Sequence, residues 1–100
     1  MSFQPSKVAL SILTLLNNVE ELIAKSNNRQ DAQDVMKALV VYANSKNYQI
    51  PLDKVDNFFD ILLDSRPNTL SFAIRDIAND IVSSERKDYL TKLSKRKLIE

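Results

Sequence analysis

The 100-residue sequence contains no histidine, cysteine, glycine or tryptophan. Without histidine, the chain lacks the commonest general base, the commonest zinc ligand and every Ser–His or Cys–His dyad. Without cysteine, it has no disulfide, thiol nucleophile or thiolate metal site. We therefore expect a protein that is not an enzyme and that uses no metal and no cofactor.

The absence of glycine excludes further kinds of site. A P-loop, a dinucleotide-binding fingerprint, a nucleophile elbow and an ordinary EF-hand loop all need glycine at a fixed position. Hairpins and tight β-turns are also disfavoured, because glycine is the usual residue for a positive φ. The nine asparagines can replace it, since asparagine is the next best left-handed residue. The composition favours helices that end on asparagine.

Long apolar runs are missing as well. The longest uncharged stretch, 8–19, contains Asn17 and Asn18 and is shorter than the about 20 apolar residues of a membrane span. Its start resembles a secretory signal, but no small-x-small cleavage motif follows and the amphipathic pattern continues through Ile23. We therefore expect a cytoplasmic protein with neither a transmembrane span nor a signal peptide.

Apolar residues recur with a helical period in four segments, which run over about 6–25, 28–46, 52–64 and 68–84. The loops between them are short, which is typical of antiparallel neighbours. The sequence therefore predicts an all-α fold, an antiparallel (up-down) four-helix bundle. We expect residues 1–84 to form the bundle core and 85–100 to be a basic helical extension of the same single domain.

Particular residues mark the helix ends and the core. Asn28 and Asn68 are predicted N-caps, and Asn47 is predicted to take the left-handed position after the second helix. Ser83 and Ser84 weaken the fourth helix, so the tail either continues it or forms a short fifth helix. The residues predicted to be buried together, one near the middle of each helix, are Leu16, Leu39, Phe59 and Ile77. The third helix is predicted to present one apolar side made of Leu52, Val55, Phe58, Phe59, Leu62 and Leu63.

A row of aspartates is the sharpest local pattern. Its members, here called the aspartate row, are Asp53, Asp56, Asp60 and Asp64. At about 100° per residue they fall within a sector of about 80°, opposite Phe58 and Leu62. We favour a solvated face, as for most charge runs, over a recognition face for a basic partner or a weak cation site. A dedicated Ca²⁺ site is not expected, because its six to eight oxygen ligands need a loop around the ion.

The tail carries the strongest charge asymmetry. Residues 85–100 hold six basic and three acidic residues, whereas 1–84 hold eight basic and ten acidic residues. The candidate partner-binding residues of the tail are Arg86, Lys87, Tyr89, Lys92, Leu93, Lys95, Arg96 and Lys97. Cations near a helix C-terminus are favourable without any partner, so a solvated helix end is one interpretation. Nucleic-acid contacts and protein docking are the others.

The overall composition indicates which of these interpretations of the tail is preferred. A nucleic-acid reader usually has a pI above about 9, and this sequence has a pI of 7.9. Its aromatic residues lie mostly in predicted core stripes, where they cannot stack on bases. A membrane-surface helix would need a larger apolar face than the tail offers, so membrane binding is not expected. Protein docking is therefore preferred, and nucleic acid is the alternative.

Some apolar residues lie off the predicted core stripes. They are Leu10, Leu13, Val41 and Phe72. Single exposed apolar residues are normal, but a cluster would mark a homodimer or partner interface. The sequence thus predicts a small non-enzymatic protein-binding domain, acting as an adaptor, a regulator or an inhibitor of a protein partner. The alternative is a nucleic-acid-associated accessory protein that uses the basic tail.

Overall fold

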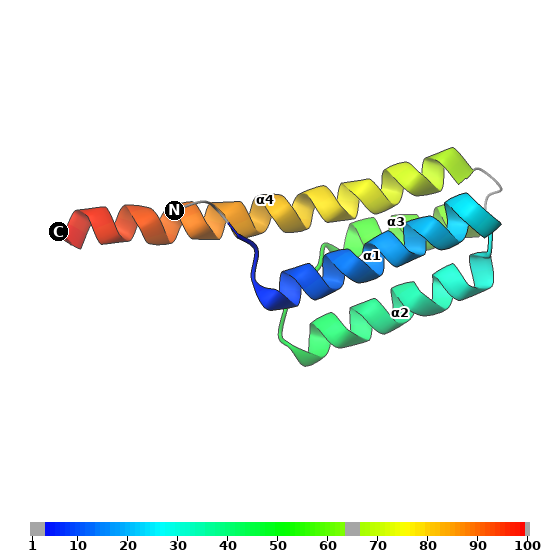
Figure 1. Cartoon of the computed structure of the whole chain (residues 1–100), viewed down its shortest axis with the longest axis horizontal. Helices are drawn as coiled ribbons and strands as arrows, with labels where there is room; N and C mark the ends of the chain where they lie inside the picture. Colours follow the sequence, from blue (N-terminus) through cyan, green and yellow to red (C-terminus); the bar gives the residue numbers. More distant parts are fainter. Residues whose placement is uncertain (1–3, 64–66, 100) are drawn as a thin grey trace.

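The computed structural model describes residues 4–63 and 67–99, with their side chains except those at 67, 68 and 95–99. The described residues form four helices and no strand. The helices are α1 (Lys7–Ser26), α2 (Arg29–Ser45), α3 (Leu52–Leu63) and α4 (Pro67–Ile99). The all-α prediction is confirmed, and Figure 1 shows the helices lying lengthwise beside one another in a packing compatible with a bundle.

Asparagine performs the turns that glycine usually makes. Asn27 ends α1 with φ 48°, and Asn47 follows α2 with φ 55°. After α2, the backbone N–H groups of Asn47 and Tyr48 donate to the carbonyls of Asn44 and Ala43 at 3.1 and 2.8 Å. This pairing is a Schellman motif, which satisfies the last carbonyls of a helix. The predicted left-handed role of Asn47 is confirmed.

The helix starts are capped as well. Asn28 accepts a hydrogen bond from the backbone N–H of Asp31 at 3.1 Å, which confirms the predicted N-cap of α2. Ser6 caps α1 by accepting a hydrogen bond from the backbone N–H of Ala9 at 3.2 Å. The predicted cap at Asn68 is wrong, because α4 already begins at Pro67. Proline suits the first helical position, where its missing N–H would have no partner within the helix.

All four helices bury their apolar faces in one shared core. The largest of its fully buried side chains are Phe58, Ile12, Leu16, Met36, Leu39, Leu70, Ile74, Ile77, Ile81 and Val19. Among the described residues, no polar or charged side chain is buried. The prediction for Phe59 is corrected: it is half-buried, and its neighbour Phe58 occupies the centre of the core. The two differ because successive helical residues point about 100° apart.

The contacts between helices are uneven. Helix α1 packs against α2 and α4, and α3 packs against α4. Two ion pairs join Lys54 of α3 to Asp76 and Asp80 of α4, at 3.2 and 2.8 Å. The contact between α2 and α3 is the least extensive of the four. The side of the molecule between α2 and α3 is therefore the least closed.

Helix α4 is much longer than the others. Figure 1 shows its C-terminal half, orange to red, projecting beyond the other three helices. Among the α4 side chains that the structure describes, Ile81 is the last buried one, and the next positions on that face are polar: Ser84, Glu85, Asp88 and Lys92. The projection gives a longest extent of 54 Å and a radius of gyration of 15.4 Å, above the about 13 Å of a compact 100-residue chain.

No fifth helix forms after Ser83 and Ser84, because α4 runs through both serines without a break. Serine lowers helix stability by less than about 0.7 kcal/mol, and the residues that follow include the good helix formers Glu85, Arg86 and Lys87. We call residues 86–99 of α4 the arm.

Candidate functional site

The base of the arm is held by residues from two distant parts of the chain. The Ser6 backbone N–H donates to the Glu85 carboxylate at 3.1 Å, and the Ser6 hydroxyl donates to the same carboxylate oxygen. Tyr48 belongs to the Schellman turn after α2 and packs partly against the core. Burial, followed by the nearby charges of Glu85 and Asp88, raises the pKa of Tyr48.

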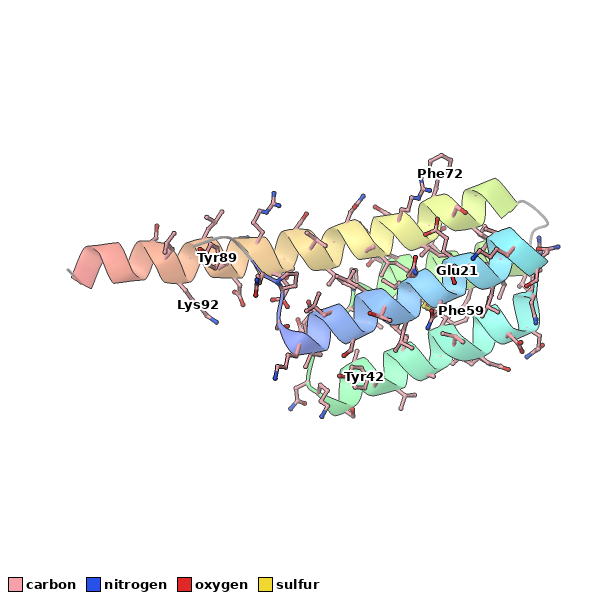
Figure 2. The ribbon with its side chains drawn as sticks, in the orientation of Figure 1. Glu21, Tyr42, Phe59, Phe72, Tyr89 and Lys92 are labelled. Carbon is pink, nitrogen blue, oxygen red and sulfur yellow. The ribbon has the colours of Figure 1, made fainter. Side chains whose placement is uncertain are left out.

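Beyond this base the arm is largely exposed. Arg86, Lys87 and Lys92 are exposed, and Tyr89 and Leu93 are half-buried. Figure 2 shows Tyr89 and Lys92 on the projecting part of α4. The side chains of the other candidate arm residues, Lys95, Arg96 and Lys97, lie outside the described residues, although the backbone there is helical.

The apolar edge of the arm turns away from the bundle core. Leu90 is 54% exposed and lies beside Arg86 and Lys87 in a shallow depression. Taking 100° per residue, Tyr89, Leu90 and Leu93 fall within a sector of about 100°. The centre of this sector is about 130° away from the face that Ile81 buries. The arm therefore presents a narrow apolar strip that the core of its own chain does not cover.

The aspartate row lies where the sequence places it. Asp53, Asp56 and Asp60 are exposed on α3, on the side opposite the buried Phe58. None of the three forms an ion pair with another described residue. The fourth member, Asp64, lies outside the described residues. Within the described parts of the chain, no three acidic side chains are grouped so that they could hold a metal ion.

The apolar residues proposed as an interface do not behave as one group. Leu10 and Val41 are exposed, and Phe72 is 69% exposed and points away from the bundle in Figure 2. Leu13 is half-buried and packs against the core, so its inclusion was wrong. Leu13 lies only about 80° from the centre of the buried face of α1, near enough to reach it. The others come from three different helices, α1, α2 and α4.

Two exposed leucines were missed because the sequence analysis counted them in the core stripe of α3. Leu52 is 62% exposed and Leu63 is 87% exposed. Both lie about 90–100° from the centre of the buried face that Val55, Phe58 and Leu62 form, so they sit on its edge. The angular spacing alone could have placed them at the edge of the stripe, although it could not have shown whether a neighbouring helix covers them. By contrast, the positions of Ser6 and Tyr48 beside the arm base bring together segments that are distant in the sequence, so no local sequence pattern predicted them.

Helix α3 is tied to α2 at only one end by a side-chain hydrogen bond. The Arg29 guanidinium Nη1 donates to the carbonyl of Leu62 at 2.9 Å, near the C-terminal end of α3. A cation there also interacts favourably with the negative end of the helix dipole. Along the rest of the seam, two depressions lie between α2 and the exposed edge of α3.

Comparison with protein-family models, with curated proteins and with solved structures gave no significant match for this chain. Among the described residues, no helix has both the length and the apolarity that crossing a membrane requires.

Proposed function

We propose that this protein is a small non-enzymatic binding domain whose arm docks onto a protein partner. One observation carries the proposal: α4 continues as an unbroken helix beyond the last core residue, with its apolar edge at Leu90 exposed. A helix segment that extends beyond the core of its own chain and keeps an exposed leucine on an apolar strip suits helix-in-groove recognition. The protein would act on this partner as an adaptor, a regulator or an inhibitor.

The proposal includes an up-down, antiparallel order of the four helices. Consecutive helices α1 and α2, and α3 and α4, pack against each other across short connections, as that order requires. In this arrangement the bundle is a rigid base. The hydrogen bonds from Ser6 to Glu85 then hold the base of the arm against the start of α1.

The test is capture of a partner from cells that express the protein, using tagged full-length chain. Leu90→Glu should abolish capture, because it replaces the exposed leucine of the apolar strip with a charge. Phe72→Glu is the matched control, since it changes an apolar residue on the same helix that is even more exposed than Leu90 and lies outside the arm. Circular dichroism should show unchanged helix content for both variants. If Leu90→Glu captures the same proteins as the unmodified chain, the arm is not the docking segment.

The basic residues of the arm support nucleic-acid binding as a second candidate. It makes a different prediction, because contacts with phosphate release counterions and weaken steeply as salt rises. Docking that buries Leu90 keeps an apolar contribution that salt does not screen, so it should weaken less steeply. Binding of generic duplex DNA below about 1 µM at physiological salt, tighter than ordinary non-specific binding, would replace the protein-docking proposal.

A further inference from the structure

The limited contact between α2 and α3 leaves two depressions, one near each end of α3, and the seam that contains both is here called the α2–α3 groove. It is lined by Gln33, Lys37 and Val40 from α2 and by Leu52, Phe59 and Leu63 from α3. The three apolar residues from α3 fall within a sector of about 40° and so form one strip along the helix. Leu52 and Leu63 are mostly exposed at its two ends. The groove thus offers an apolar strip about 18 Å long, the length of the 12-residue α3.

The outer rim of the groove is acidic on the α3 side. Asp56, Asp60 and Asp53 follow the leucine strip at about 40°, 80° and 100° around the helix, counted from Leu52. All three are exposed and form no ion pair with another described residue. The α2 side carries two cations among uncharged residues: Lys37, and Arg29, whose guanidinium donates to the carbonyl of Leu62. An occupant of matching chemistry is a helix with a narrow apolar strip and a basic flank.

The arm has this chemistry. Lys87 lies about 60° around the helix from the edge of the arm's apolar strip, on the side of Leu90. Arg86 is exposed and lies within the strip. On the other side of the strip, going around the helix, Lys92 comes first and the acidic Asp88 lies beyond it. The acidic Asp88 suits the α2 side of the groove, which carries a lysine. The 14 residues of the arm span about 21 Å, close to the length of α3.

The arm cannot reach the groove of its own chain while α4 remains one helix, since the helix axis carries it beyond the bundle (Figure 1). Pairing of two arms would bring like charges together, because residues 85–100 hold six basic and three acidic residues. Pairing of an arm with a groove brings opposite charges together. The charge pattern therefore favours an arm from a second molecule in each groove.

We propose that two copies of this chain form a two-fold symmetric dimer in which each arm lies in the α2–α3 groove of the other copy. The proposal rests on the proposed function and names its partner as a second copy. Antiparallel placement of two long α4 helices, related by the two-fold axis, sets each arm beside the bundle of the other copy. The exchange is reciprocal, so the assembly closes at two copies and does not grow into a fibre.

The first experiment measures the mass of the purified full-length chain by sedimentation over a range of concentrations. We expect a monomer–dimer equilibrium, weakened about tenfold or more by Leu90→Glu or by Leu63→Glu, since one changes the arm and the other the groove. Phe72→Glu should leave it unchanged. A chain that stays monomeric up to about 1 mM, where even weak specific complexes form, overturns the dimer. In that case arm-dependent capture of another protein would still support the proposed function.

The second experiment exchanges the charges. The groove variant carries Asp56→Lys and Asp60→Lys, and the arm variant carries Arg86→Glu and Lys87→Glu. Each alone should dimerise about tenfold more weakly, because an arm then meets a groove of like charge. Mixed together, they should form a heterodimer within about threefold of the original affinity, because both arm–groove contacts regain opposite charges.

A control separates this recognition from general attraction between oppositely charged proteins. Glu21→Lys with Asp34→Lys gives the same net charge as the groove variant, but both residues are exposed outside the groove lining. Mixed with the arm variant, it should not restore the heterodimer. If it restores it as well as the groove variant does, or if neither mixture associates, the arm does not occupy the α2–α3 groove.

Discussion

Three phenylalanines with graded burial test the packing of the core most directly. Phe58 is 0% exposed, and its ring meets that of Phe59 edge to face, with 5.5 Å between the centroids and 71° between the planes. Phe58→Ala removes a fully buried ring and leaves a cavity beneath α3. Substitutions of this kind cost about 3–5 kcal/mol in free energy of unfolding. A domain of this size is stable by about 5–15 kcal/mol, so the loss is a large share of the total.

The other two rings should cost progressively less. Phe59→Ala removes a half-buried ring and should cost about 1 kcal/mol, roughly half the transfer free energy of a buried phenylalanine. Phe72→Ala removes a mostly exposed ring and should change stability by less than about 0.5 kcal/mol. The expected order of destabilisation is therefore Phe58, then Phe59, then Phe72.

Urea unfolding followed by circular dichroism at 222 nm measures all three variants against the unmodified chain. The slope of free energy against urea should stay the same, since it reflects the surface exposed on unfolding. The reasoning fails if Phe58→Ala costs less than about 1 kcal/mol, well below the range for a buried ring. It fails equally if Phe59→Ala costs more than Phe58→Ala, because Phe59 would then be the central core residue.

Three other predictions concern single surface or turn residues. Asn27→Ala should cost about 1 kcal/mol in urea unfolding while Asn27→Gly costs nothing, because alanine is strained at positive φ and glycine is not. Asp60→Asn should change stability by less than about 0.5 kcal/mol, with any gain coming from relieved repulsion along the row. The raised pKa of Tyr48 means that the folded chain holds the phenol proton more tightly than the unfolded chain. Stability from this group is complete below about pH 10 and is lost as pH rises through the folded pKa, so Tyr48→Phe should flatten the decline in alkaline unfolding titrations.

The helix pattern and most helix ends could be predicted from local sequence. Asn28 and Asn47 act within three or four residues of their own position, so the sequence around each contains the whole cause. Whether the helix breaks or continues at Ser83 and Ser84 could not be predicted in this way. A serine pair costs α4 little, and the neighbouring helix formers outweigh it. Local propensity can locate a weak point but cannot decide whether the helix breaks there.

The candidate site depends on relations that no local pattern contains. The strip on α3 became visible only when the limited contact between α2 and α3 left Leu52 and Leu63 uncovered. From the sequence alone, a leucine at the edge of a stripe is indistinguishable from one that a neighbouring helix covers. The contact between Ser6 and Glu85 joins residues 79 positions apart, and it could be found only from the fold.

The apolar side of α4 changes direction after Ile81. Up to that residue the apolar positions face the core, and afterwards the same face carries Glu85, Asp88 and Lys92. A helix end that served only to remain in solvent would need no apolar strip at all, yet Leu90 and Leu93 place one on the opposite side. Within the monomer Leu90 gains little from burial, because it is more than half exposed. In the proposed dimer a second surface covers this strip, and the aspartates beside the exposed strip on α3 supply the charge opposite to that of the arm.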